Sequence, residues 1–174
     1  MPELKKIDAK DLPDEIYFET SSREAYHIRI NSSSRTLNTR LEKKENLVVR
    51  LRLDRLNFEP FKEFSKAYAF KEGDKNLAYL QYGFDKRCER YEIYNIFVEK
   101  DFRRKGLGRI LMEKVLEDID KNIYIVARVR SDNVDAVDFF ESFGFEIIGH
   151  DLYAYSNDGL EKQSIELILG KFKS

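Results

Sequence analysis

The stretch that decides the fold runs from residue 92 to residue 109 and reads Glu92-Ile93-Tyr94-Asn95-Ile96-Phe97-Val98-Glu99-Lys100-Asp101-Phe102-Arg103-Arg104-Lys105-Gly106-Leu107-Gly108-Arg109. Its first part is rich in aromatic and β-branched residues, which favour a strand. A polar segment with two glycines follows, and the apolar spacing of a helix begins after it. The sequence therefore predicts a strand that passes through a short glycine-containing loop into a helix.

The loop between this strand and the helix is suited to an anion. Glycine allows the backbone to approach a ligand closely, and the free N–H groups and dipole of a first helical turn favour negative charge. Arg103, Arg104, Lys105 and Arg109 add four positive charges. We therefore expect a diphosphate here. A dinucleotide fingerprint would need a third glycine where Leu111 stands, and the Gly-Lys-Ser/Thr of a P-loop is absent.

Downstream of the loop, the pattern predicts alternating helices and strands. Apolar residues mark one face of a helix from 110 to 119, and Lys114 and Asp118, four apart, suit an ion pair on its wet face. Asp132 or Asn133 is expected to cap a second helix, which Gly144 ends. Strands are predicted at 123–129, 145–148 and 164–169.

Upstream, the chain is predicted to be mostly strands. Residues 16–19 and 24–30 are rich in Tyr, Phe and Ile, which favours strands, and apolar residues alternate in 24–30 and 46–53. A short helix is expected at 58–65. A hairpin joins strands 66–71 and 77–84. The whole pattern predicts a mixed α/β fold with one large sheet.

Composition narrows the functional classes. The 174 residues include 31 Lys and Arg against 32 Asp and Glu, for a net charge of -1, which argues against the broad positive surface of a nucleic-acid-binding protein. The single cysteine, Cys88, excludes an internal disulfide, and the isolated His27 and His150 argue against a metal site. No signal peptide and no run of roughly 20 apolar residues is found, so we expect a cytoplasmic protein that does not enter a membrane.

Three motifs resemble those of the GCN5-related N-acetyltransferase (GNAT) superfamily. Arg103-x-x-Gly106-x-Gly108 is similar to its acyl-CoA signature. The strand Glu92-Ile93-x-Asn95-Ile96-x-Val98 resembles the one that precedes the signature. Twenty-five residues after Gly108 begins a run similar to the second motif, Asn-x-x-Ala-x-x-Phe/Leu-Tyr-x-x-x-Gly-Phe, with the matching residues Asn133, Ala136, Phe139, Phe140, Gly144 and Phe145.

The resemblance spans residues 66–169 and implies a fold. We expect a single N-acetyltransferase domain over residues 1–174, with one central, mostly antiparallel mixed sheet flanked by helices. Residues 66–170 would form the acetyl-CoA-binding core, and residues 1–65 a divergent region on the acceptor side.

The resemblance also implies how acetyl-CoA is held. The strand that carries Ile96 and Val98 splays from its neighbour around a bulge, so that unpaired backbone groups bind the pantetheine arm. The N–H near Val98 polarises the thioester carbonyl, the loop holds the pyrophosphate, and Asn133 hydrogen-bonds the pantetheine. No metal is expected. The implied cofactor-binding residues are Ile96, Phe97, Val98, Arg103, Arg104, Lys105, Gly106, Leu107, Gly108, Arg109, Asn133 and Phe140.

Catalysis needs a base, because an alkylamine with a pKa of about 10.4 is mostly protonated at neutral pH. Glu92 matches the position of a general-base glutamate in several members; its other interpretation is a strand-end charge paired with Arg90. The second motif often supplies a tyrosine as general acid, but the matching Phe140 has no proton to give. Tyr153 and Tyr155 are substitutes, unless they only pack in a strand; otherwise the thiolate leaves unaided.

Two groups of acetyltransferases are similar in different parts. Residues 129–169 resemble ribosomal-protein alanine N-acetyltransferases, which usually carry a glutamate where Arg128 stands. This difference argues against a protein N-terminus as substrate. The strands from Ala67 through Val98, and Leu152-Tyr153-Ala154, resemble streptothricin acetyltransferases. The first 65 residues, where acceptor specificity normally resides, match neither group.

The leading interpretation is an acetyl-CoA-dependent enzyme that acetylates a primary amine of a small molecule or peptide by direct attack. The first alternative is a non-catalytic GNAT-like domain that binds CoA or mediates an interaction, which Phe140 favours. The second is a nucleic-acid-binding module that uses Arg50, Arg52 and Arg55, against which the balanced charge argues. The resemblance also allows a homodimer through edge strands.

Overall fold

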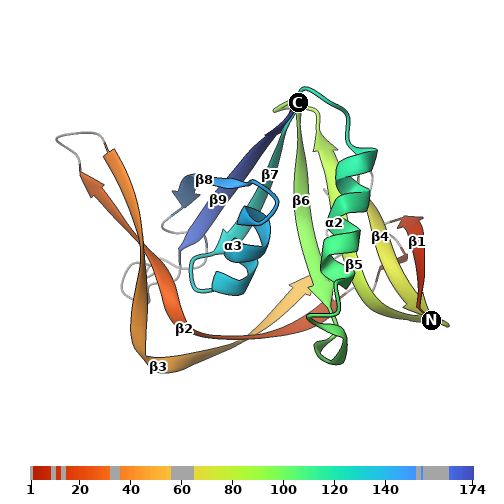
Figure 1. Ribbon diagram of the computed structural model, residues 1–174, viewed down its shortest axis with the longest axis horizontal. Helices are drawn as coiled ribbons and strands as arrows, with labels where there is room; N and C mark the ends of the chain where they lie inside the picture. Colours follow the sequence, from red (N-terminus) through yellow and green to blue (C-terminus); the bar gives the residue numbers. More distant parts are fainter. Residues whose placement is uncertain are drawn as a thin grey trace. The chain divides into compact units, whose positions relative to one another are not determined.

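The strands and helices follow one another as Figure 1 shows. The computed structural model describes residues 2–8, 11–12, 15–31, 36–55, 65–151, 154 and 165–174; for residues 15–23, 27–31, 36–39 and 44–55 it describes the backbone. The elements are β1 (Glu3–Asp8), β2 (Glu15–Asn31), β3 (Thr36–Arg55), β4 (Ser65–Glu72), β5 (Lys75–Asp85), β6 (Arg90–Val98), the 3-10 helix η2 (Lys100–Phe102), α2 (Leu107–Asp118), β7 (Ile123–Arg130), α3 (Val134–Glu141), β8 (Glu146–Asp151) and β9 (Glu166–Lys173).

The described strands form two sheets. One has seven strands in the order β1-β4-β5-β6-β7-β9-β8, and β2 pairs with β3 in the other. The pairs β1–β4, β4–β5, β5–β6 and β8–β9 are antiparallel, whereas β6–β7 is parallel. Parallel neighbours need a crossover, which α2 supplies here. The predicted mixed, mostly antiparallel sheet with flanking helices is therefore confirmed.

The chain divides into two compact units. The first comprises residues 1–16, 53–127 and 172–174, and the second comprises residues 17–52 and 128–171. The predicted strand, loop and helix of residues 92–109 lie in the first unit, whereas Asn133 and Phe140 lie in the second. The expected single domain, with its boundary at residue 65, stays a prediction.

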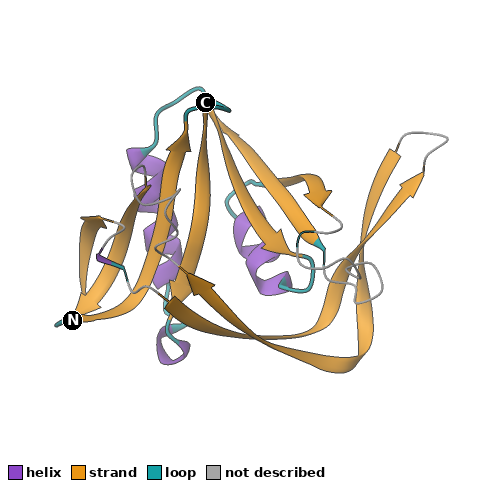
Figure 2. Cartoon of the chain, turned by 180° about the vertical axis from the view of Figure 1, so that it is seen from behind, coloured by secondary structure: helices purple, strands orange, loops and turns teal. Residues whose placement is uncertain are grey.

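In the first unit, α2 packs against one face of β4, β5 and β6 (Figure 1). The helix buries Leu111, Met112 and Val115, whose spacing of one and three residues places them on one face. Figure 2 views the strands from the other side. The opposite face of the sheet carries a second apolar cluster, which consists of Leu12, Ala67, Ala69 and Tyr79 with Ile7 and Phe97 packed against it.

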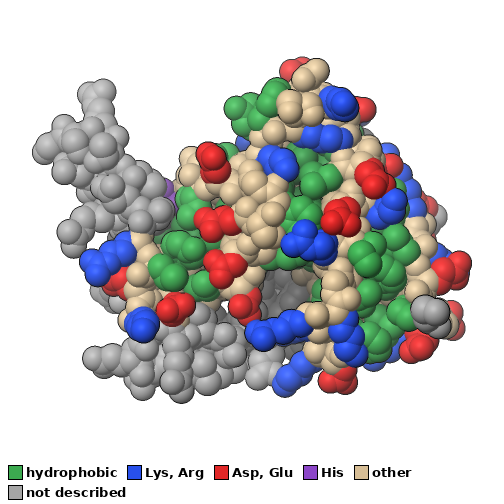
Figure 3. Space-filling model, in the orientation of Figure 1, with side chains coloured by type: hydrophobic (Ala, Val, Ile, Leu, Met, Phe, Trp, Pro, Cys, Tyr) green, Lys and Arg blue, Asp and Glu red, His purple; other side chains and the backbone are tan. Residues whose placement is uncertain are grey.

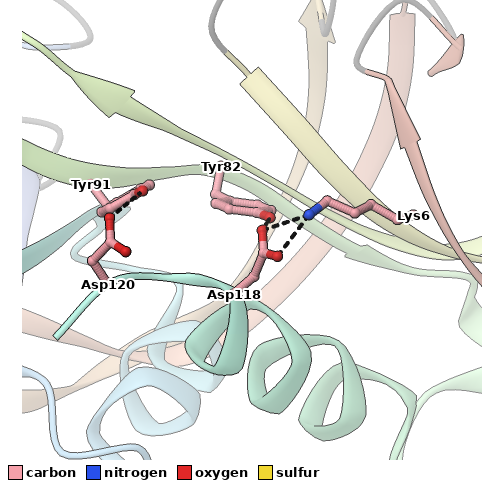
Figure 4. A network of polar contacts seen from close by, with 5 residues as sticks. All are labelled: Lys6, Tyr82, Tyr91, Asp118 and Asp120. Carbon is pink, nitrogen blue, oxygen red and sulfur yellow. Dashed lines mark hydrogen bonds and ion pairs between the residues drawn. The ribbon is translucent and has the colours of Figure 1, made fainter.

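A polar network joins β1 to the end of α2 (Figure 4). Lys6 Nζ donates to Asp118 Oδ1 and Oδ2 at 2.7 and 2.8 Å, and the Tyr82 hydroxyl donates to Oδ2. Burial opposes ionisation of Asp118, but the hydrogen bonds from Lys6 and Tyr82 outweigh it, so its pKa is lowered. The expected pairing of Asp118 with Lys114 is wrong, because Lys114 contacts Glu117 at 2.5 Å instead.

In the second unit, α3 ends where the sequence predicted. Gly144 has a φ of +80°, and its N–H donates to the carbonyl of Glu141 at 2.8 Å. The Phe145 N–H donates to the carbonyl of Phe140 at 3.2 Å. These bonds satisfy carbonyls at the helix end, which is the usual role of a C-terminal glycine. Lys171 Nζ also donates to the carbonyl of Phe143 at 2.5 Å.

The N-terminal half differs from expectation. The strand β1 was not predicted, and the strands expected at 16–19 and 24–30 are parts of the single strand β2. The expected strand 46–53 belongs to the longer β3. The short helix predicted at 58–65 falls on residues outside the described ones, except that Ser65 begins β4. In the described part of the chain, no helix is long and apolar enough to cross a membrane.

Candidate functional site

The strand β6 carries a bulge. Its register with β5 runs from Ala78↔Val98 to Gln81↔Asn95 and then shifts to Tyr82↔Ile93. One extra residue, Tyr94, therefore lies on β6 between two paired positions. A bulge bends the strand and redirects the side chains around it.

The two edges of β6 are paired over different lengths. The described register with β7 runs from Tyr91↔Ile125 to Ile93↔Ala127, whereas the register with β5 continues to Val98. The two registers overlap at the head of the strand. From Asn95 to Val98, the described pairing of β6 is with β5 alone.

The loop after β6 is fastened to the strands. The Glu99 N–H donates to the Leu77 carbonyl at 2.8 Å, and the Phe102 N–H donates to the Glu99 carbonyl at 2.9 Å. The Arg103 side chain folds back, so that its Nε donates to the Val98 carbonyl at 3.0 Å. One N–H group of the Arg103 guanidinium therefore holds the loop against the end of β6.

The loop enters α2 through a left-handed glycine. Gly106 occupies the N-cap position with φ +83° and ψ −4°, and no side chain caps the helix. Its carbonyl accepts the first helical bond, from the Ile110 N–H at 3.1 Å. Arg104 also has a positive φ, of 59°. The first-turn N–H groups have no intrahelical partner by geometry, and no acidic residue lies in that turn.

The surroundings of this helix start are basic. Figure 3 shows Lys and Arg side chains gathered over the loop that leads into α2. Lys105 Nζ lies 4.9 Å from the centroid of the Phe102 ring, a cation–π contact. Arg103, Arg104, Lys105 and Arg109 are exposed. The dipole, the N–H groups and the cations together favour a strongly negative group such as a diphosphate.

The base candidate Glu92 lies on the sheet face opposite α2. Tyr82 of β5 contacts Asp118 of α2, so its side chain lies on the face that α2 covers. The next residue, Gly83, belongs to the opposite face, and Glu92 is registered with Gly83. Glu92 is half-buried. Burial, together with the charges of Glu92 and Asp85, raises the pKa of Tyr94 to about 12. The Tyr94 phenol is therefore protonated at neutral pH, at the bulge two residues from Glu92.

Asn133 stands at the start of α3, but its side chain does not cap the helix. Its carbonyl accepts from the Ala136 and Val137 N–H groups at 3.0 and 3.1 Å, and no side-chain cap bond forms. The carboxylate of Asp132 is bound by Arg130 instead, with Nε to Oδ1 at 3.1 Å. The expected capping by the Asn133 side chain is therefore wrong.

The aromatic position of the second motif lies in the core of the second unit. Phe140 is 3% exposed, and its ring contacts those of Phe139 and Phe145 with centroids 5.5 and 5.2 Å apart. Arg128, where similar enzymes carry a glutamate, pairs with Glu166 at 2.7 Å. Phe140 offers no proton, and its contact with the cofactor stays a prediction.

The other predicted site residues fall into three groups. The β6 residues Ile96, Phe97 and Val98 are half-buried, as are Leu107 and Gly108 of α2. Tyr153 and Tyr155 lie outside the described residues, as do the side chains of Arg50, Arg52 and Arg55. No group of three potential metal ligands is found among the described residues, and the expected absence of a metal stays a prediction.

Sequence reasoning missed a polar contact beside the bulge. Asn95 Nδ2 donates to Gln81 Oε1 at 3.1 Å across β6 and β5. The available signal was a glutamine that interrupts the apolar run from Leu77 to Tyr82. An amide in such a run indicates a polar partner, although it does not say which.

Comparison with known proteins agrees with this geometry. The model of the acetyltransferase (GNAT) family matches residues 15–145. The [ribosomal protein bS18]-alanine N-acetyltransferase of Salmonella typhimurium is 36% identical over 55 residues, which are 30% of this chain and 37% of that protein. The chain thus spans little more than a third of this relative.

Two solved structures share the fold over most of the chain. A nourseothricin acetyltransferase superposes with a TM-score of 0.68 at 13% identity, covering 91% of this chain and 98% of that one. A Bacillus anthracis (strain Ames) protein assigned as a streptothricin acetyltransferase, solved with acetyl coenzyme A, gives 0.65 at 16% identity and covers 99% of both chains. The family match extends over most of the described strands and both helices, so the chain belongs to the acetyltransferase (GNAT) family.

Proposed function

We propose that this protein binds acetyl-CoA along β6 and at the start of α2, and transfers the acetyl group to a primary amine of a small molecule or peptide. The observation that carries the proposal is the left-handed Gly106, which opens an uncapped and basic helix start directly after a bulged strand. A structural neighbour solved with acetyl coenzyme A supports the choice of cosubstrate.

The residues at the helix start fit the pyrophosphate. A Cβ built on Gly106 would meet no atom within 4 Å, so the space beside this backbone is open. The N–H groups of residues 107–109 would donate to the phosphate oxygens, while Arg104, Lys105 and Arg109 would offset their charge. Arg103 would hold the loop in place through its bond to the Val98 carbonyl.

The pantetheine arm and the thioester would lie along β6. The backbone of Ile96 and Val98, on the edge away from β5, would pair with the amides of the arm, and Phe97 stays a prediction for a contact with the cofactor. The Val98 N–H would donate to the thioester carbonyl and stabilise the developing oxyanion. Asn133, whose side chain is not used as a cap, stays a prediction for a hydrogen bond to the cofactor.

Glu92 would act as the general base. The acetyl thioester supplies the electrophilic carbonyl carbon. Glu92 takes a proton from the ammonium group, directly or through water, and the freed lone pair forms the C–N bond. The C–S bond then breaks, and its electron pair leaves on the thiolate. A second proton leaves the nitrogen and the thiolate gains one, which gives an amide and free CoA.

The leaving thiolate has no evident proton donor at Phe140. Thiols are comparatively acidic, with an ordinary pKa of about 8.5, so that a thiolate can leave without help. Tyr153 and Tyr155 stay predictions for a donor. The buried Phe140 also favours a second candidate, a GNAT domain that binds CoA without transferring the acetyl group. The location in the cytoplasm and the formation of a homodimer also stay predictions.

A paired experiment tests the proposal. Calorimetry with acetyl-CoA measures binding, and a thiol reagent follows CoA release with polyamines, aminoglycosides, streptothricin-like amines and short peptides. Binding together with amine-dependent release supports the enzyme. Binding without release for every amine supports the non-catalytic domain, and absence of binding contradicts both.

A further inference from the structure

Three polar side chains form a row across the sheet face opposite α2, within the first unit. Gln81 Nε2 donates to Ser65 Oγ at 3.0 Å, and Asn95 Nδ2 donates to Gln81 Oε1 at 3.1 Å. The residues come from β4, β5 and β6. Ser65 is registered with Gly83, two residues from Gln81, and Gln81 is registered with Asn95, so all three share one face.

The row is buried at its centre. Gln81 is 1% exposed and Ser65 is 8% exposed. A buried amide without partners would cost about 1–3 kcal/mol, so the hydrogen bonds to Ser65 and Asn95 stabilise Gln81 in this position. The neighbouring part of this face is apolar, with Tyr79 packed among Ala67 and Ala69. An apolar residue at position 81 would fit that surrounding without any need for partners.

The row orients its outer member, Asn95. Because Gln81 presents its oxygen to β6, Asn95 must present its NH₂ group to β5. Nitrogen and oxygen lie on opposite sides of an amide, so Asn95 Oδ1 is turned away from β5. Asn95 is half-buried, and no side chain in the described part of the chain donates to this oxygen. In this arrangement the row ends in a hydrogen-bond acceptor.

This acceptor lies beside the proposed reaction centre. Asn95 and Glu92 flank the bulge at Tyr94 and share the face opposite α2. The Val98 N–H, which would bind the thioester carbonyl, lies three residues further along β6. An amine nitrogen held between Asn95 Oδ1 and the Glu92 carboxylate would donate one hydrogen bond to each.

We propose that Asn95 Oδ1 binds the amino group of the acceptor, and that Gln81 and Ser65 are positioning residues that act through Asn95. The inference rests on the proposed acetyl transfer, because that reaction is what would require an amine here. Binding of the amine to Asn95 can nevertheless be measured without acetyl transfer. A neutral primary amine has two N–H bonds, one for Asn95 and one for Glu92, with its lone pair free for attack. The site therefore selects primary amines over N-methylated ones.

Nuclear magnetic resonance tests the site without turnover. The probe is n-butylamine at millimolar concentration, added to ¹⁵N-labelled protein saturated with CoA, and the readout is the side-chain NH₂ resonance of Asn95. Tetramethylammonium is the matched probe, since it carries the same charge without N–H donors. We expect a shift with n-butylamine, none with tetramethylammonium, and none at Asn76 with either. Equal shifts with both cations, or no shift with either, would overturn the proposal.

Substitutions supply a second readout. The side-chain NH₂ resonance of Asn95 is assigned because it disappears from the spectrum of Asn95→Leu. If the leucine variant fails to fold, Asn95→Asp removes the same resonance. With acetyl-CoA and n-butylamine, Asn95→Leu should raise the KM of the amine at least tenfold, about 1.4 kcal/mol, and leave the Kd of acetyl-CoA unchanged. Asn95→Asp keeps an acceptor oxygen and should restore the KM, because Gln81 can turn its NH₂ group to the carboxylate while Ser65 donates to its oxygen.

Asn76→Leu is the matched control, because Asn76 is the second residue of β5 and lies five residues before Gln81. It should leave the KM of n-butylamine unchanged. A wild-type KM in Asn95→Leu would overturn the inference and leave acetyl transfer intact. A specific n-butylamine shift in a protein that transfers no acetyl group would instead contradict the proposed function and retain the amine site.

Discussion

Gly106→Val tests whether the loop before α2 is the cofactor site. Gly106 has φ +83°, and a left-handed backbone costs an L residue about 1–2 kcal/mol. An added Cβ meets no atom within 4 Å, so strain rather than collision sets the loss of stability. At about 2–4 °C per kcal/mol for a chain of this size, the midpoint of thermal unfolding should fall by about 2–8 °C.

Gly106→Val should also weaken acetyl-CoA binding, by a steric effect that does not depend on the backbone strain. A branched side chain at Gly106 would stand where the phosphate oxygens must approach the backbone, so the Kd of acetyl-CoA should rise at least tenfold, about 1.4 kcal/mol. Calorimetry measures the Kd, and circular dichroism follows unfolding. Gly73→Val is the matched control, because Gly73 also has a positive φ, of 59°, and open space around its Cβ.

The comparison of the two valine variants decides the matter. Both should lose similar stability, and Gly106→Val alone should lose affinity. Gly106→Asn adds a third case, since asparagine tolerates the left-handed region better than valine; it should regain stability but still bind weakly. Wild-type affinity in a folded Gly106→Val protein would refute the assignment of the loop to the pyrophosphate.

Three further predictions concern the base, the network and the second motif. Glu92→Gln should lower kcat about 10²-fold at neutral pH, and the loss should shrink at alkaline pH, where the amine arrives deprotonated; a pH–rate profile measures this. Asp118→Asn should reduce the free energy of unfolding by about 1–2 kcal/mol, since its charge-assisted bonds are partly exposed. Because the pKa of Asp118 is lowered, this stabilisation is present above the ordinary carboxyl pKa and is lost as the pH falls through the folded-state pKa, so the two denaturation curves should converge in acid. Asn133→Asp should weaken acetyl-CoA binding in calorimetry without lowering the unfolding midpoint, since no cap bond is lost.

The part of the fold that local rules govern could be predicted from the sequence. The strand, loop and helix of residues 92–109 follow from apolar periodicity and two glycines, and Gly144 ends α3 as expected. The strand β1 could not be found in this way, because four of its six residues, Glu3, Lys5, Lys6 and Asp8, are charged. Its pairing with β4, from Glu3↔Lys71 to Asp8↔Lys66, is a tertiary contact.

The candidate site was predictable in its chemistry but not in its fine geometry. The basic glycine loop was visible as an anion site, whereas the family resemblance implied a bulge in this strand without giving its position, Tyr94. The capping rule failed at Asn133 because residue type indicates a cap without ensuring that the side chain forms it. The partners of Gln81 depend on the register between strands, which a single sequence does not state.

The central claim is acetyl transfer from acetyl-CoA to a primary amine, and a mass balance tests it most directly. The protein is incubated with acetyl-CoA and each amine, and mass spectrometry quantifies the acetylated amine while a thiol reagent quantifies free CoA. The account predicts equal amounts of both products, above the protein-free blank and strongly reduced in Glu92→Gln. Saturable binding of acetyl-CoA with neither product above the blank, for every amine tested, would contradict it.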